Sequence, residues 1–483
     1  MTAAPVLTGA PGLEQCFLFD AVEASYEVTG IEGAVPAWLR GSYYVNGPAL
    51  FERAGLRYQH WLDGDGMICS LRFTADGVHF TNRFIETQKR REEQEAGRFI
   101  YRGFGTAFPG DKLRRGLMLE PPVNVSVYPF DGRLLAFGEQ TLPYDLDPIT
   151  LETRGEYDFH GKLNAVSPFA AHAKLDPNLM NFGVQFSPNQ PILNVYEFDP
   201  SGALVRRKRH PLTMPHSIHD FGFTPASYVF FLSPLLMDFE RFHRDAVSVV
   251  ESLQWAPERG SSILVLPRST DAGAPAVFSA PAGHGYCLHM INSFERADGK
   301  LVVDILELDE PVYPEYQPIP DVFSTVKGCR PVRFIVDRAS QRVEERIAMD
   351  YEHTPDFPSI HPQLAGREYN EFWMLGISAA GEPGRKFFDE LARGSWRDGG
   401  VRDVYRAAPG RYLGGEPVFV PNPSPGAAES DGVIVVQHLL PESQAAEFLL
   451  FDAAHVARGP IARLPLRHPI HPGFHASFQS EVN

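Results

Sequence analysis

Residues 67–85 read MICSLRFTADGVHFTNRFI, and the fold can be predicted from this stretch and its relatives along the chain. Apolar and polar residues alternate within Met67–Phe73 and again within Val78–Phe84, the two-residue period of a strand with one buried face. Between these runs lies Asp76-Gly77, and an Asp-Gly pair between alternating runs is the strongest short signal for a β-hairpin. The stretch therefore predicts two antiparallel strands joined by a turn.

The same pattern recurs along the chain. Turn residues interrupt alternating runs at residues 125–139, 192–210, 289–308, 332–349 and 447–466. Helical windows are few, and we expect short helices at residues 92–104 and 383–396 only. Because no linker divides the chain, we expect one all-β domain over residues 1–483, with hairpins repeated around an axis as a β-propeller. A pair of β-sandwich domains is the structural alternative.

Composition restricts the class of function. The chain has 483 residues, of which 43% are hydrophobic, and this is enough to form a large core. Its formal net charge of −16 argues against nucleic-acid binding. The basic run Arg206–His210 lies in a predicted hairpin and is expected to face solvent. The four cysteines form no CxxC pair, and no signal peptide or transmembrane run is evident. These features favour a cytoplasmic protein, which we expect to be a monomer.

Several histidines lie where predicted strands begin or end. They are His172 in FAAHAKLDP, His216 and His219 in HSIHDFGFTP, His289 in GYCLHMINSFE and His475 in GFHASF. Considered singly, each is better explained as an ordinary core or surface residue, since no HExxH or His-x-His motif is present. A propeller, however, brings strand starts from distant parts of the chain together at its axis. Four imidazoles meeting there could bind iron, copper, zinc or nickel, with carboxylates on their second ring nitrogens.

The chain resembles the carotenoid cleavage oxygenases, the family that includes the retinal pigment isomerase and the stilbene-cleaving dioxygenases. The resemblance rests on an ordered series of segments: GSYYVNGPAL (41–50), YQHWLDGDGMICSLRF (58–73), RFIETQKRREEQEAGRFIYRGFGT (83–106), LLAFGEQTLPYDLDPITLETRG (134–155) and GFHASF (473–478). It implies a seven-bladed β-propeller with Fe(II) on the axis. We expect the few short helices and loops to form a cap over one face.

The resemblance also implies the metal ligands. The four histidines that match the family's iron-binding motifs are His172 in AHAK, His219 in IHDFGFT, His289 in HMINSFE and His475 in FHASF. Three other histidines have no counterpart in those motifs: His216, His468 and His471. Since His475 lies close to the last residue of the sequence, the resemblance implies that this segment returns to the axis and is buried.

Three carboxylates outside the ligand set can be assigned in the same way. Glu139 in AFGEQ and Glu416 in GGEPVFVPNP match the family pattern. The third motif usually reads Glu-Phe-Pro, and in this chain it reads Asp-Phe-Pro, which gives Asp356. Aspartate is one methylene shorter, so its hydrogen bond would be lost, bridged by water or kept by a backbone shift.

The implied function is that of a non-haem Fe(II) dioxygenase that uses dioxygen to cleave a C=C bond of a carotenoid or apocarotenoid into two carbonyl products. The alternative substrate is a stilbene or phenylpropenoid, and a less favoured interpretation is a polyene isomerase on the same iron. The stilbene-cleaving branch places a Tyr and a Lys against a phenolic oxygen. Tyr101 is a candidate substrate contact, but MLEPPVNVSV (118–127) offers no Lys, which favours the carotenoid-type substrate.

An apolar substrate would be taken up from lipid, so the protein is expected to have a membrane-facing entrance. Two segments combine apolar residues with a predicted loop: Phe230–Phe242 and Tyr101–Leu119. Exposed apolar loops are typical of peripheral membrane contact. Interior packing is the alternative explanation for both segments.

Overall fold

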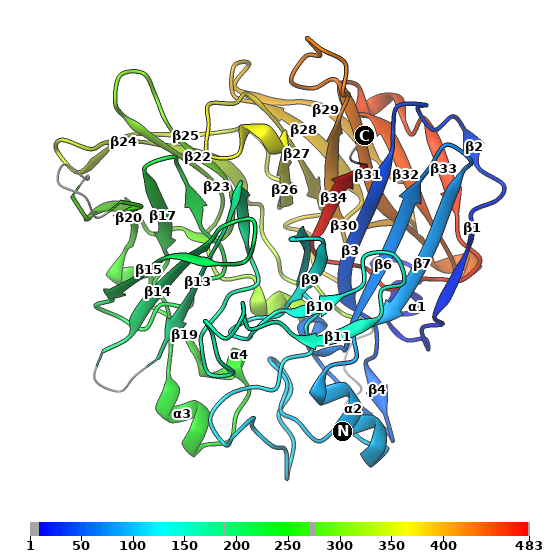
Figure 1. The fold of residues 1–483 in the computed structure, drawn as a ribbon, viewed down its shortest axis with the longest axis horizontal. Coiled ribbons are helices and arrows are strands. Elements are labelled where there is room, and N and C mark those ends of the chain that lie inside the picture. The colour runs from blue at the N-terminus through cyan, green and yellow to red at the C-terminus, as the bar shows by residue number, and fades with distance from the viewer. Residues whose placement is uncertain (1–8, 187–189, 270–275, 482–483) are drawn as a thin grey trace.

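The chain folds into sheets arranged around a central axis (Figure 1). The computed structural model describes residues 9–186, 190–269 and 276–481. Within these ranges, seven sheets of four or five strands surround the axis, and we number them blades 1 to 7 in chain order. The expected β-propeller with seven blades is confirmed, and the pair of β-sandwiches is excluded.

The first four blades contain the following strands, in order from the outer edge to the axis. Blade 1 contains β1 (Ala24–Glu27), β7 (Val78–Phe84), β6 (Gly66–Phe73), β3 (Gly41–Pro48) and β34 (Ala476–Ser480). Blade 2 contains β11 (Thr153–Glu156), β10 (Tyr144–Leu146), β9 (Arg133–Phe137) and β8 (Ser126–Phe130). Blade 3 contains β15 (Leu204–Pro211), β14 (Ile192–Phe198), β13 (Asn178–Gln185) and β12 (Lys174–Asp176). Blade 4 contains β21 (Phe278–Gly283), β20 (Ser261–Pro267), β17 (Ser227–Leu232) and β16 (Gly222–Phe223).

The remaining blades follow the same plan. Blade 5 contains β25 (Arg342–Ala348), β24 (Arg330–Asp337), β23 (Leu301–Leu308) and β22 (Tyr286–Glu295). Blade 6 contains β29 (Gly400–Arg406), β28 (Glu390–Ser395), β27 (Glu371–Gly376) and β26 (Asp356–Ile360). Blade 7 contains β2 (Glu32–Gly33), β33 (Ala462–Pro465), β32 (Ala445–Asp452), β31 (Gly432–Leu440) and β30 (Tyr412–Pro421). Two small ribbons pair β4 (Glu52–Arg53) with β5 (Leu56–Arg57), and β18 (Leu235–Met237) with β19 (Leu253–Trp255).

Helices are short and lie between strands. They are α1 (Glu14–Phe17), α2 (Gln88–Ala96), α3 (Phe239–Arg244) and α4 (Val249–Ser252). Single 3-10 turns are η1 (Trp61–Asp63), η2 (Pro257–Arg259), η3 (Tyr313–Tyr316), η4 (Pro362–Leu364), η5 (Pro441–Ser443) and η6 (Val456–Arg458). Across the described ranges, no helix has the length and apolarity needed to cross a membrane.

The hairpins expected from alternation are confirmed. Antiparallel pairs form between β6 and β7, β8 and β9, β14 and β15, β22 and β23, β24 and β25, and β32 and β33. Between β8 and β9, Asp131 and Gly132 have φ angles of 52° and 67°, the left-handed conformation that a two-residue hairpin turn requires. Residues Arg206–His210 lie on β15, where exposure alternates along the outer strand, as expected.

The two helical windows are largely wrong. Helix α2 begins four residues earlier than expected and ends at Gly97, whose φ of 64° provides the left-handed cap. The second window contains no helix, because Glu390–Ser395 is the strand β28 between β27 and β29. Both faces of such a strand pack on neighbouring blades, so its sequence shows no alternation and resembles a short buried helix.

Connections from several blades pack together beside the ring. Phe104 accepts a hydrogen bond from the amide of Val250 at 3.0 Å, which joins the segment after α2 to α4. The His60 imidazole nitrogen Nε2 lies 2.9 Å from the carbonyl oxygen of Tyr313, which joins η1 to η3. The amide of Ile319 donates to the carbonyl of Gln59 at 3.0 Å. These contacts link loops from different blades into a cap.

The structure gives no support to the first candidate membrane loop, in which Leu236 and Phe239 are half-buried. Phe230 and Phe231 lie on β17, and Leu235 on β18, and all three are buried. Apolar side chains in the core cannot reach a lipid surface. Within the second segment, Tyr101 is buried and Leu117 is exposed, which leaves a single large apolar side chain and not a patch.

Both ends of the described chain close the ring. Strand β34 pairs antiparallel with β3, with Ala476 opposite Val45, so residues separated by most of the sequence share blade 1. Strand β2 pairs with β33 and completes the outer edge of blade 7. On β3, Asn46 joins blade 1 to blade 2: its amide nitrogen Nδ2 donates to the carbonyls of Val123 and Ser126 at 3.1 and 2.9 Å.

We expect Asn46→Ala to lower the free energy of unfolding by about 2–4 kcal/mol, because two buried carbonyls would lose their donor. Denaturant unfolding of the metal-free protein measures this change. Asn422→Ala, at a surface loop where the side chain donates to Asp431, is the matched control and should change stability by less than about 1 kcal/mol. Equal stability of the two variants would contradict the role of Asn46 in joining blade 1 to blade 2.

Candidate metal centre

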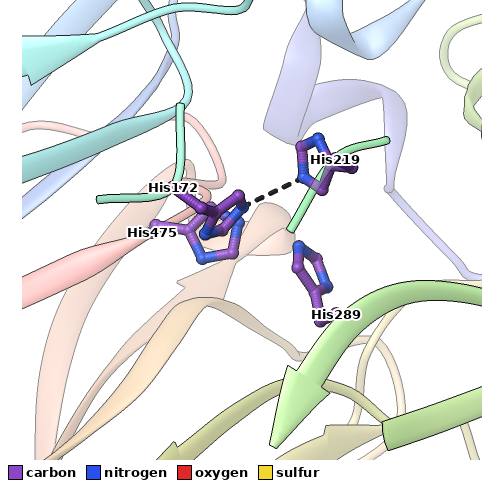
Figure 2. A group of neighbouring side chains, drawn as sticks. All are labelled: His172, His219, His289 and His475. Carbon is purple, nitrogen blue, oxygen red and sulfur yellow. Dashed lines mark hydrogen bonds between the residues drawn. The ribbon is translucent and has the colours of Figure 1, made fainter. Parts of the chain in front are cut away.

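Four histidines from four blades meet at the axis (Figure 2). His172 lies two residues before β12, and His219 lies three residues before β16. His289 lies within β22, and His475 immediately precedes β34. These are inner strands, and the inner strands of neighbouring blades pack against one another around the axis. The propeller therefore brings together residues that the sequence separates by up to 303 positions.

The imidazoles face one another closely. One candidate ligand atom from each of the four rings can be chosen so that all lie within 4.8 Å of one another. The Nε2 atoms of His172 and His219 are 3.0 Å apart, and the ring centroids of His172 and His475 are 4.2 Å apart. All four side chains are buried.

The donor set fits a transition-metal cation. His289 Nε2 is buried without a hydrogen-bond partner in the described structure, so a lone pair faces the group. Burial, together with the other three histidines, holds the pKa of His172 well below its usual range. Burial, followed by His289 and His219, does the same to the pKa of His475. Neutral imidazoles converging on one point are typical ligands of divalent iron, copper, zinc and nickel.

The three expected carboxylates each lie beside a different histidine. Glu139 Oε1 is 2.6 Å from His219 Nδ1, and Glu416 Oε2 is 3.1 Å from His475 Nδ1. Asp356 Oδ1 accepts a hydrogen bond from His289 Nδ1. With its proton on Nδ1 and directed to a carboxylate, an imidazole keeps the Nε2 lone pair for a metal.

Irregular strands aim these residues at the axis. The register shifts in β22 beside His289, in β26 beside Asp356 and in β30 beside Glu416. Such β-bulges redirect side chains and are common next to functional sites. In β26 the residue after Asp356, Phe357, has a φ of 54°, which is strained for an aromatic residue. The shorter aspartate thus keeps its hydrogen bond where the backbone is displaced.

Burial also affects the pKa values of the carboxylates beside the histidines. It raises the pKa of Glu416 to about 7, although the amide of Ala476 donates to this carboxylate and favours its charged form. For Asp356 burial is the largest single effect and acts in the same direction, but His289, the amide of Phe357 and His475 together outweigh it, and the pKa falls below its usual value. A cation bound by the histidines would favour the ionised form of both carboxylates.

The three histidines without a counterpart in the family motifs lie apart from the group. His216 Nδ1 is 2.8 Å from the carbonyl oxygen of Ser233, and the ring of His471 stacks on Phe19 at 3.9 Å. His468 is exposed. The hydroxyl of Tyr101, the candidate substrate-contacting residue, donates a hydrogen bond to Glu92 of α2 at 2.5 Å. Tyr101 is therefore bonded to helix α2 in this structure.

Other residues of the site were not expected from the sequence. The ring of Tyr313 lies 6.3 Å from that of His219, and the ring of Phe357 lies 5.2 Å from that of His475. Asp220 is buried, with Oδ1 3.9 Å from His172 Nδ1. Its position directly after His219 in IHDFGFT is the one sequence signal that could have pointed to it.

Comparisons with known proteins agree with this arrangement. The family model described as RPE65, retinal pigment epithelial membrane protein, matches residues 19–480. The apocarotenoid-15,15'-oxygenase of Synechocystis sp. is 30% identical over 478 residues, covering 94% of each chain. The isoeugenol monooxygenase of Pseudomonas putida is 28% identical over 476 residues, covering 95% of this chain and 96% of that one. The crystal structure of cobalt-substituted Synechocystis ACO has a TM-score of 0.88 at 28% identity, covering 98% of this chain and 99% of that one.

The matched range contains all four clustered histidines and the three carboxylates beside them. The likeness extends over nearly the whole chain in both sequence and fold. The chain belongs to the carotenoid cleavage oxygenase family, the family of the retinal pigment epithelial membrane protein.

Proposed function

We propose that this protein is a non-haem Fe(II) dioxygenase that cleaves a C=C bond into two carbonyl products. The observation that carries the proposal is the buried group of four imidazoles with converging nitrogens. In the proposal, His172, His219, His289 and His475 hold the iron, and Glu139, Asp356 and Glu416 orient three of these ligands. Ferrous iron bound there would supply the electrons that make dioxygen reactive toward an alkene.

The protein's own contribution is to hold the metal ligands in place and to orient the substrate's double bond. Carboxylates beside three of the imidazoles fix their ring orientation and favour a metal-binding lone pair. Tyr313 and Phe357 place aromatic surface beside the histidines, which suits an apolar alkene better than a charged substrate. Holding one double bond beside the metal is a task of positioning, in which geometry provides much of the rate enhancement.

For the substrate, we propose a carotenoid or apocarotenoid. Support comes from the 30% identity with apocarotenoid-15,15'-oxygenase over 94% of both chains. A phenylpropenoid is the second candidate, because relatives of similar coverage are an isoeugenol monooxygenase and a lignostilbene-alpha,beta-dioxygenase. Oxygen uptake on matched panels of apocarotenals, stilbenes and isoeugenol decides between the two classes.

Replacing a proposed ligand should abolish metal binding. We expect His475→Ala, and likewise His172→Ala, His219→Ala and His289→Ala, to lose stoichiometric iron after anaerobic loading, as measured by elemental analysis. His468→Ala, at an exposed position, and His216→Ala, bonded to Ser233, should retain it. Full iron retention by His475→Ala would remove this residue from the ligand set.

Loss of the shortened carboxylate should weaken, but not abolish, the site. Without Asp356, His289 loses the acceptor that fixes its ring, and we expect Asp356→Ala to reduce iron affinity about 10- to 100-fold. Competition with a chelator measures the affinity. Asp337→Ala, in a surface turn of blade 5, is the control and should bind iron as the wild type does. Wild-type affinity in Asp356→Ala would show that its contact with His289 is not used.

Isotope labelling tests the reaction class. With labelled dioxygen, we expect one labelled oxygen atom in each of the two products, since a dioxygenase delivers both atoms to one double bond. Aldehydes exchange oxygen with water, so products must be reduced to alcohols as they form. One unlabelled product under fast trapping would indicate a monooxygenase, and altered double-bond geometry without cleavage would indicate an isomerase.

A further inference from the structure

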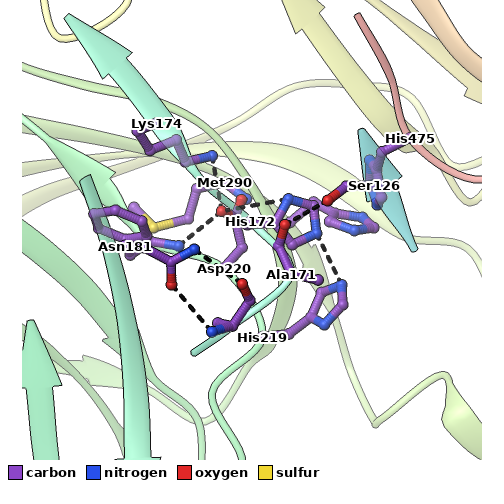
Figure 3. A network of polar contacts seen from close by, with 12 residues as sticks. Ser126, Ala171, His172, Lys174, Asn181, His219, Asp220, Met290 and His475 are labelled. Carbon is purple, nitrogen blue, oxygen red and sulfur yellow. Dashed lines mark hydrogen bonds and ion pairs between the residues drawn. The ribbon is translucent and has the colours of Figure 1, made fainter. Parts of the chain in front are cut away.

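Asp220 is a buried carboxylate beside the histidine group (Figure 3). Its side chain is 3% exposed, and it directly follows His219 in the sequence. Its Oδ1 lies 3.9 Å from His172 Nδ1, too far for a direct hydrogen bond but close enough for a charge to act. Its Oδ2 accepts the amide hydrogen of Met290 at 2.9 Å, and Met290 directly follows His289.

These contacts connect three ligands to one carboxylate. His219 is linked to Asp220 through the chain, His289 through the next backbone amide, and His172 through the electrostatic field. The three histidines belong to the inner strands of blades 3, 4 and 5 or to the residues just before them. A shift of Asp220 would therefore change the spacing of all three at once.

Each of the three expected carboxylates lies beside one of the other histidines, and none of them pairs with His172. Within the described ranges, Glu139, Asp356 and Glu416 lie beside His219, His289 and His475. The acidic group in ion-pair range of His172 is Asp220. It differs from the other three because it also pairs with a lysine: Lys174 Nζ lies 2.7 Å from Oδ1, and the Lys174 side chain is 24% exposed.

We propose that Asp220 is a positioning residue, the fourth carboxylate beside the histidine group after Glu139, Asp356 and Glu416. We further propose that Lys174 adjusts the effect of the negative charge of Asp220 on the metal. The carboxylate sets the spacing of His172, His219 and His289 and adds negative charge beside the metal. Lys174 offsets part of that charge. This inference rests on the proposed function in one respect, namely that a divalent metal binds the four histidines.

Two substitutions that each remove one charge, Asp220→Asn and Lys174→Met, test the proposal. The measured quantity is the affinity of the full-length protein for Co²⁺, and the two variants should change it in opposite directions. Asp220→Asn removes negative charge from the site and should lower Co²⁺ affinity about tenfold or more. Lys174→Met removes a positive charge and should raise Co²⁺ affinity by about threefold. Both should shift the visible absorption of bound Co²⁺, because the ligand geometry or field changes.

The matched control is Asp304→Asn. Asp304 is fully buried and paired with Arg333 at 2.8 Å, but it lies on β23, outside the inner ring. Asp304→Asn should lower the thermal midpoint and leave the Co²⁺ affinity and spectrum unchanged. A purely structural Asp220 would behave in the same way, and that result would overturn the proposal.

The outcomes separate the two levels of inference. If the wild type fails to bind stoichiometric Co²⁺, the proposed metal function fails and this inference fails with it. If the wild type binds and both variants keep its affinity, only the role of Asp220 is refuted. If both variants lose affinity, the tuning role of Lys174 is refuted. Should Asp220→Asn not fold, Lys174→Met decides alone: increased affinity supports the proposal, and unchanged or reduced affinity refutes it.

Discussion

Four buried imidazoles each bring one ligand nitrogen to within 4.8 Å of the others, and this convergence is the constraint on which the rest of the structure depends. His172 and His219 lie within hydrogen-bond distance of each other, but His289 Nε2 has no partner in the described structure, and a buried polar atom without a partner is costly. The fold must hold them there by other means. It does so with carboxylates behind three of the rings and with inner strands that cannot move independently.

The propeller supplies this rigidity. Each inner strand is hydrogen-bonded within its own blade, and contacts between inner strands run from β16 through β22, β26, β30 and β34 to β8. Bulges at His289, Asp356 and Glu416 then break the regular ladder where the site requires a particular direction. A regular fold thus fixes the position of the axis, and local irregularity fixes the direction of each side chain.

Much of this could be predicted from sequence, and the exceptions have physical causes. Alternation reveals strands with one exposed face, such as β15, but not β28, which is buried on both faces. The four histidines are found through motif resemblance, and the fold brings them together. The reach of Asp356 depends on a register shift against β27, which involves a partner strand and leaves no local signal. Asp220 escapes sequence reasoning because its partners Lys174 and Met290 are distant along the chain. The membrane loop expected at Phe230–Phe242 shows a different limit, because composition does not distinguish a buried apolar segment from a surface loop.

Closure of the ring by β34 has a consequence for the order of synthesis. Strand β3 emerges from the ribosome long before its inner neighbour β34, because more than 400 residues separate the two strands. At typical translation rates that delay is about 20 to 90 seconds. Throughout it the inner edge of β3 lacks its native partner, and an unpaired edge invites intermolecular pairing. At most three of the four clustered histidines exist during this interval, so the complete four-histidine site cannot form on the nascent chain until β34 completes blade 1.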